Sequence, residues 1–200
     1  MHYTGTIWRP PYEAYSLLIQ VTAGCTHHSC KFCTLYEDLP FKFRMSPLSE
    51  VKSDLAEASR YYKNAPRIFF TGANPFVLTT DKLKKLAEMV KKYYPNYQTI
   101  GCFGRITDLY NKTVDDLKEL RALGYDGITF GVETGNDEAL AFMNKGFRSS
   151  DTIEQAKKLE KAGISYNFFY LTGISGAGRG EYGGKETAKV FNQLHPQIIE

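Results

Sequence analysis

The sequence predicts an α/β fold with parallel β-strands, and two observations support this prediction. Short apolar runs, rich in β-branched and aromatic residues, alternate along the chain with longer segments of helical periodicity. Such runs suit strands that are buried on both faces of a sheet. Each strand–helix unit takes roughly 30 residues or more, the length of a βαβ connection. Because a closed barrel of eight units needs about 250 residues, this 200-residue chain is expected to form a partial barrel or an open sheet.

Five apolar runs are predicted as complete strands. They cover residues 15–22, 67–71, 98–103, 127–133 and 164–173. Residues 196–200 read as the start of a sixth strand, which is cut short by the end of the sequence. A sheet that stopped inside an apolar strand would leave an unpaired edge. We therefore expect the sequence to be a C-terminally truncated part of a longer protein.

Helices are predicted between the strands from apolar stripes and from capping residues. The predicted starts are Ser46–Pro47, Thr80 or Asp81, Thr113, Asn136 or Asp137, Ser150 or Asp151, and residue 185. The predicted ends include Gly124, Met143, Gly163 and Leu194. The glycine-rich stretch 176–184 is expected to be flexible.

Composition and charge are those of an ordinary globular protein. Hydrophobic residues make up 42% of the chain and aromatic residues 14%, which argues against disorder. The 25 basic and 22 acidic side chains leave a net charge of +3, too balanced to indicate nucleic-acid binding. The N-terminal residues do not resemble a secretory signal, and no apolar run approaches the roughly 18 residues of a membrane span. We therefore expect one cytoplasmic domain, residues 1–200, in which thiols stay reduced.

Three cysteines and two histidines lie close together in the stretch GCTHHSCKFC. They are Cys25, His27, His28, Cys30 and Cys33. The stretch follows the first predicted strand directly, and ligands in parallel βα folds gather at the carboxyl ends of strands. Three thiols in a reducing compartment indicate a metal site rather than a disulfide framework.

Two kinds of metal site fit this spacing. A structural zinc ion needs four ligands, so Cys102 or one of the histidines would have to join the three clustered cysteines. A [4Fe–4S] cluster commonly takes one thiolate per iron, so three cysteines would leave one iron open to an exchangeable ligand. In the second interpretation the histidines are loop residues and Cys102 is a buried small hydrophobe. The first would make the chain a zinc-binding or non-catalytic interaction domain.

The cysteine triplet in this strand context resembles the radical S-adenosylmethionine (radical SAM) superfamily, in its coproporphyrinogen dehydrogenase-like branch. The spacing of four and two residues between the cysteines is a variant of the commoner three and two. The resemblance implies a partial (βα)6 TIM-like barrel with a [4Fe–4S] cluster on Cys25, Cys30 and Cys33 and with S-adenosylmethionine on the fourth iron. It implies reductive cleavage of S-adenosylmethionine to methionine and a 5′-deoxyadenosyl radical, which abstracts hydrogen from a small-molecule or other unknown substrate. It also implies an external electron donor such as flavodoxin or ferredoxin.

Further positions match family elements that contact the cofactor. Phe32 lies where members place a ring against the adenine. The turn after the second strand, which receives the methionyl ammonium in the family, is Thr71, Gly72, Ala73 and Asn74.

The later strands supply the remaining candidates. Glu133 ends the fourth strand at the polar cofactor position, and Lys145 falls where the branch pairs a basic residue with the methionyl carboxylate. Arg105, after the third strand, could bind a carboxylate of cofactor or substrate, because guanidinium groups bind planar anions in a bidentate manner. Asn167, Gly173 and Ile174 match the region near the adenine.

Overall fold

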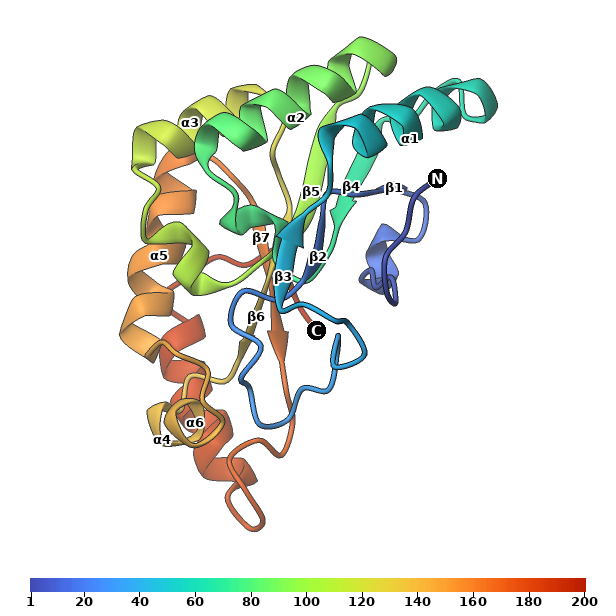
Figure 1. Ribbon diagram of the computed structural model, residues 1–200. Coiled ribbons are helices and arrows are strands. Elements are labelled where there is room, and N and C mark those ends of the chain that lie inside the picture. Colours follow the sequence, from blue (N-terminus) through green and yellow to red (C-terminus); the bar gives the residue numbers. More distant parts are fainter.

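An open sheet of six parallel strands forms the centre of the molecule (Figure 1), in a computed structural model that describes all of residues 1–200. The strands follow one another in the order β1-β4-β5-β6-β7-β8. Their bounds are β1 Leu17–Gln20, β4 Arg67–Thr71, β5 Thr99–Gly104, β6 Ile128–Glu133, β7 Tyr166–Tyr170 and β8 Ile198–Ile199. Because β1 and β8 do not pair with each other, the sheet stays open. The predicted partial barrel is confirmed.

The helices cover the outer side of the sheet, above and to the left of the strands in Figure 1. They are α1 Leu48–Tyr61, α2 Thr80–Tyr93, α3 Val114–Ala122, α4 Asp137–Phe142, α5 Ser149–Ala162 and α6 Gly180–Phe191. Short 3-10 helices are η1 Pro11–Glu13, η2 Pro75–Val77 and η3 Ile106–Leu109. None of the helices is both long enough and apolar enough to span a membrane.

Several predicted caps are present. The side chains of Thr113 and Asn136 accept backbone N–H groups of the first turns of α3 and α4. Gly163 ends α5 in the left-handed conformation, with φ 72°. For α2 the cap is Thr79, one residue before the predicted start. These short-range signals are readable from sequence because a cap bonds to residues only two or three positions away.

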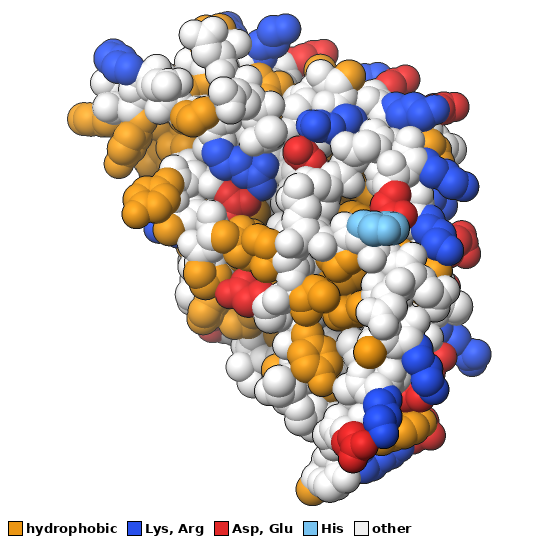
Figure 2. Space-filling model, turned by 180° about the vertical axis from the view of Figure 1, so that it is seen from behind, with side chains coloured by type: hydrophobic (Ala, Val, Ile, Leu, Met, Phe, Trp, Pro, Cys, Tyr) orange, Lys and Arg blue, Asp and Glu red, His pale blue; other side chains and the backbone are white.

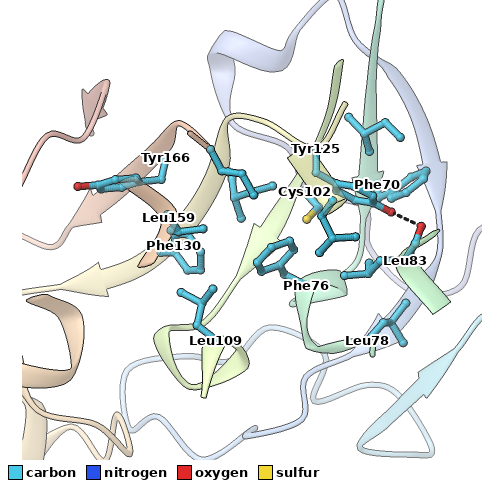
Figure 3. Close-up of a cluster of buried hydrophobic side chains, with 14 of the residues drawn as sticks. Phe70, Phe76, Leu78, Leu83, Cys102, Leu109, Tyr125, Phe130, Leu159 and Tyr166 are labelled. Atoms are coloured by element: carbon cyan, nitrogen blue, oxygen red, sulfur yellow. Dashed lines mark hydrogen bonds between the residues drawn. The ribbon is translucent and has the colours of Figure 1, made fainter. Parts of the chain in front are cut away.

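The core between helices and sheet contains large aromatic and aliphatic side chains (Figure 3). Tyr125 is fully buried, and its hydroxyl donates a hydrogen bond of 2.8 Å to the carbonyl oxygen of Leu83. Cys102 lies in this cluster with no exposed surface, and burial raises the pKa of its thiol far above the usual range. Cys102 is therefore a core residue, as predicted.

Several element boundaries were predicted wrongly. The N-cap of α5 is Arg148 rather than Ser150 or Asp151, and the Asp151 side chain accepts from the Arg148 amide at 2.7 Å. The predicted strand 15–22 ends at Gln20, and Thr22–Gly24 (β2) leaves the sheet to pair antiparallel with Phe43–Met45 (β3). The predicted strand 164–173 is shortened to β7. The stretch 176–184 was expected to be flexible, with the last helix starting at residue 185, but α6 already begins at Gly180. A Cβ atom on Gly183 would lie 2.0 Å from Oγ of Ser175, so the glycine permits a close packing contact that outweighs its poor helix propensity.

The N-terminal segment, residues 1–16, lies to the right of the strands in Figure 1, and its residues 8–13 contact the sheet at β4 and β6. At the carboxyl end of β4, the Thr71 hydroxyl donates to the carbonyl oxygen of Trp8 at 3.2 Å. In mid-sheet the Tyr12 and Thr129 hydroxyls are 2.8 Å apart, and at the amino end of β4 Arg67 pairs with Glu13 at 2.5 Å. Residues 8–13 therefore extend along the sheet from the carboxyl end of β4 to its amino end.

Candidate active site

A cavity of about 290 Å³ lies at the carboxyl ends of the strands and contains all three clustered cysteines. Its walls come from the N-terminal segment, from the ends of β5, β6 and β7, and from residues 25–42. Residues 25–42 join β2 to β3 and contain the three clustered cysteines, so we call them the cysteine loop. In Figure 1 this loop lies beyond the lower ends of the strands. Figure 2 shows the molecule from behind, with hydrophobic side chains gathered across the middle of this face and most charged side chains towards its edges. The cavity size is in the range of small-ligand sites.

The base of the cysteine loop is closed by backbone contacts. Gly24 has φ 76°, and a Cβ atom there would lie 2.2 Å from the carbonyl oxygen of Lys42, so only glycine fits. The next amide, of Cys25, donates to the same carbonyl oxygen at 2.9 Å. Within the loop, the Cys33 amide donates to the Cys30 carbonyl oxygen at 3.1 Å and closes a turn between the second and third cysteines.

The loop is also fastened to the segment that follows α4. The Lys31 amide donates to the Met143 carbonyl oxygen at 3.1 Å, and the Asn144 side-chain amide donates to the Ser29 carbonyl oxygen at 3.0 Å. Nε2 of His27 donates to the Asn144 carbonyl oxygen. Burial lowers the pKa of His27, which favours the neutral ring. His27 is thus engaged in holding the loop.

Glu133 and Lys145 form a mostly buried ion pair on the cavity wall. Lys145 Nζ lies 3.4 Å from Glu133 Oε1 and donates to the Gly131 carbonyl oxygen at 2.7 Å. Glu133 has φ 70°, at a register irregularity between β6 and β7. A non-glycine residue in this conformation is strained, and such strain concentrates at functional sites. Lys145 Nζ also lies 5.4 Å from the centre of the Phe32 ring, within the range of a cation–π contact.

A second cation, Arg105, enters the cavity from the end of β5. Its guanidinium donates to the Thr107 hydroxyl at 3.1 Å and to the Lys145 carbonyl oxygen at 2.5 Å. Burial raises the pKa of the Cys30 thiol, while the charges of Lys145 and Arg105 act in the opposite direction. The site therefore places soft sulfur ligands beside positive charge, a setting that favours anionic ligands.

The predicted turn after β4 divides between the cavity and the interior. Ala73 lines the cavity. The Thr71 side chain instead holds Trp8, and Gly72, with φ 131°, leaves no room for a Cβ atom because Thr22 Oγ1 would lie 2.1 Å away. The Asn74 side chain is fully buried and bonds to Thr26 and Asp108 rather than lining the cavity.

Three other predicted contacts lie outside the cavity lining. Asn167 is buried on β7, and its Oδ1 atom has no hydrogen-bond partner. Gly173 and Ile174 follow β7 in the connection to α6. The structure therefore brings together eight predicted residues: Cys25, Cys30, Phe32, Cys33, Ala73, Arg105, Glu133 and Lys145.

Other lining residues were not identified from sequence. Trp8 and Arg9 reach the cavity only because the N-terminal segment crosses the sheet, and no local pattern announces this. Tyr36 lines the cavity from the cysteine loop, and burial beside Cys25 and Cys33 raises its pKa to about 12. Phe103 and Phe169, whose ring centres are 6.1 Å apart, also line the cavity. Phe103 ends the predicted strand 98–103, a position that could have marked it as a candidate, whereas Phe169 lies inside the predicted strand 164–173.

The donor set fits a cluster better than a single ion. No three His, Cys, Asp or Glu side chains lie close enough together to hold one metal ion. A zinc site needs four ligands on one ion, and the buried Cys102 is committed to the core. An iron–sulfur cubane distributes its thiolates over separate irons, so three thiols around one cavity match it.

The family model described as "Radical SAM superfamily" matches residues 19–181 of the chain. The chain belongs to the radical SAM superfamily. Radical SAM proteins are enzymes that generally use a [4Fe–4S] cluster and S-adenosylmethionine.

Curated relatives show the same relationship at low identity. The chain is 26% identical over 199 residues to the uncharacterized protein MJ0486 of Methanocaldococcus jannaschii, covering 94% of this chain and 60% of that protein. It is 22% identical over 152 residues to the heme chaperone HemW of Bacillus subtilis, covering 72% of this chain and 39% of that protein. The chain thus spans 60% and 39% of the length of these relatives.

Solved structures share the radical SAM fold. The methyltransferase TsrM of Kitasatospora setae, with cobalamin and a [4Fe–4S] cluster bound, superposes with a TM-score of 0.71 at 15% identity, covering 92% of this chain and 36% of that one. Coproporphyrinogen III oxidase (HemN) of Escherichia coli gives 0.64 at 17% identity, covering 92% and 43%. Methylornithine synthase gives 0.67 at 14% identity, covering 92% and 51%.

Proposed function

We propose that this radical SAM protein holds a [4Fe–4S] cluster on Cys25, Cys30 and Cys33 and binds S-adenosylmethionine in the adjoining cavity. The observation that carries the proposal is the shared cavity, in which three soft ligands stand beside Arg105 and Lys145 at the carboxyl ends of parallel strands. The chemistry supplied by the bound group is one-electron cleavage of S-adenosylmethionine to methionine and a 5′-deoxyadenosyl radical, which abstracts hydrogen from a substrate.

The cations and the polar wall are suited to an amino-acid end group. Lys145 and Arg105 would bind a carboxylate, and backbone groups at the turn from Thr71 to Ala73 would receive an ammonium. Glu133 would accept hydrogen bonds from the cofactor, because it lines the cavity. Its strained backbone conformation also supports a functional role.

The apolar wall is suited to a planar base and to the exclusion of water. Phe32 would lie against the adenine, and Phe103 and Phe169 add apolar surface to the cavity wall. Fixed dipoles and charges in such a site act more strongly than in water. Asn167, Gly173 and Ile174 stay predictions for a ligand that extends beyond the cavity.

The remaining parts of the proposal concern the partners. The electron would come from an external donor such as flavodoxin or ferredoxin, and the substrate would be a small molecule. We propose a cytoplasmic location, because free thiols that bind a cluster require a reducing compartment.

Anaerobic reconstitution with iron and sulfide tests the proposal. Absorbance, iron content and EPR of the reduced protein should report a [4Fe–4S] cluster whose EPR signal changes when S-adenosylmethionine is added. The Cys30→Ala protein should lose the cluster, whereas the matched Cys102→Ala protein should keep it, because Cys102 lies in the core. An EPR-active, S-adenosylmethionine-responsive cluster in the Cys30→Ala protein would contradict the assignment. Tight binding of zinc with no cluster would favour the interaction-domain alternative.

A further inference from the structure

The Asn74 side chain connects the cysteine loop to the ends of two central strands. It follows β4, is fully buried, and makes a reciprocal pair of hydrogen bonds with Thr26, the residue after Cys25. Its Nδ2 group donates to the Thr26 hydroxyl oxygen at 2.7 Å, and its Oδ1 atom accepts from the Thr26 amide at 3.3 Å. One side chain therefore fixes both the backbone and the side chain of a residue adjacent to a predicted cluster ligand.

Asp108 determines which way the Asn74 amide faces. Its carboxylate oxygens lie 3.1 and 3.2 Å from Asn74 Nδ2. An ionised carboxylate only accepts hydrogen bonds, so the NH2 group of Asn74 must face Asp108 and its oxygen must face the Thr26 amide. The reversed amide would set an oxygen against a carboxylate and an NH2 group against an N–H donor.

Asp108 is itself held in place by its own neighbours. The Arg105 amide donates to Asp108 Oδ2 at 2.8 Å, and the buried Lys112 ammonium donates to the Asp108 carbonyl oxygen at 3.1 Å. These contacts anchor the carboxylate to the start of η3, directly after β5. The chain of contacts thus runs from β5 through Asp108, Asn74 and Thr26 to Cys25.

We propose that Asn74 is a positioning residue, which holds the first ligand of the cysteine loop in place through Thr26, with Asp108 fixing the orientation of its amide. This assigns Asn74 a role other than contact with the cofactor. It explains why a polar side chain with no surface exposure stands at this turn, since hydrogen bonds offset the cost of burying an amide. The assignment concerns the loop itself and does not depend on which metal centre the cysteines hold.

Amide hydrogen exchange of the 200-residue protein, before cluster loading, gives the first test. The Asn74→Leu variant keeps the approximate size of the side chain and removes its hydrogen bonds with Thr26 and Asp108. We expect exchange of residues 25–33 to accelerate on the order of tenfold or more, with β5 and β6 unchanged. The matched control is Thr152→Val on α5. It removes a buried hydroxyl that has no hydrogen-bond partner, and it should leave exchange in the loop unchanged.

A milder pair of variants keeps the proposal testable if Asn74→Leu does not fold. Thr26 is only partly buried, so both Thr26→Val and Thr26→Ser should fold. Thr26→Val removes the hydroxyl that accepts from Asn74 and should accelerate loop exchange, whereas Thr26→Ser keeps it and should behave as the unaltered protein. Equal exchange rates in all three proteins would overturn the proposal.

The reconstituted cluster supplies a second readout that is independent of turnover. Thr26→Val should shift the EPR line shape or the midpoint potential of the reduced cluster, because the environment of a cluster sets its potential, and Thr26→Ser should restore both. If no variant assembles a cluster but the exchange pattern is as expected, the positioning role stands and the proposed function fails. If the cluster assembles and neither readout distinguishes valine from serine, the positioning role is wrong.

Discussion

The two ends of the barrel interior each contain a mostly buried glutamate paired with a cation, but the two pairs differ in how completely they are bonded. At the amino end, Arg67 contacts both carboxylate oxygens of Glu13 and also donates to the carbonyl oxygens of Asp126 and Gly127. At the carboxyl end, Lys145 makes one 3.4 Å contact with Glu133 beside an open cavity.

The difference separates a structural contact from one that is available to a ligand. A buried charge is tolerated where hydrogen bonds replace those of water, and the Glu13–Arg67 pair meets this condition. The Glu133–Lys145 pair meets it less completely, and Glu133 is also strained. A cofactor with a carboxylate and polar hydroxyls would complete the bonding of the second pair.

Removing the cation at the amino end should have the largest effect on stability. Arg67→Met leaves the buried Glu13 without its partner, and the free energy of unfolding should fall by about 3–5 kcal/mol. Urea denaturation followed by circular dichroism measures this loss. A change below about 1 kcal/mol would mean that the pair is not the structural contact inferred here.

Asp108, buried behind the cavity, should make stability depend on pH. Burial raises its pKa from 3.8 to about 6, so the native state binds more protons than the unfolded state between those values. Stability contributed by the neutral acid is therefore present below pH 3.8 and is lost as the pH rises through about 6. The loss should be about 2–3 kcal/mol in the natural protein relative to Asp108→Asn, measured by denaturation across this pH range. Parallel pH profiles for the two proteins would contradict the shift.

Removing the cation at the carboxyl end should weaken ligand binding more than folding. In the reconstituted protein, Lys145→Gln should reduce affinity for S-adenosylmethionine about 10- to 100-fold, the effect of losing a hydrogen bond to a charged group. Anaerobic calorimetry measures this loss, and urea denaturation should show a smaller change than that of Arg67→Met. Unchanged affinity would remove Lys145 from the proposed binding site.

A solvent-exposed pair on α6 gives the smallest effect and sets the baseline for the comparison. Lys185 and Glu181 are 2.6 Å apart with most of both side chains in solvent. Lys185→Ala should leave both the unfolding midpoint and the affinity for S-adenosylmethionine unchanged, because water and salt screen such pairs. A marked loss of either would show that burial does not determine the order of the three pairs.

Local signals made much of the fold predictable. Apolar runs and caps such as Thr113, Asn136 and Gly163 depend on residues a few positions apart, so they survive without knowledge of the fold. The misplaced boundaries of β1 and α6 have a common cause, which is a contact with residues outside the segment itself. Residues 22–24 are apolar enough for the sheet but pair with β3, and α6 starts early because Gly183 packs on Ser175.

By itself, the sequence determined the order of parallel strands and helices, the burial of Cys102 and the placement of three cysteines after the first strand. Only the tertiary structure decided that the N-terminal segment crosses the sheet and brings Trp8 and Arg9 to the cavity, and that Asn74 turns away from it towards Asp108. The physical reason is the range of the interactions. Periodicity and capping act between near neighbours, whereas the contacts of Trp8 with Thr71 and of Thr26 with Asn74 join residues 63 and 48 positions apart.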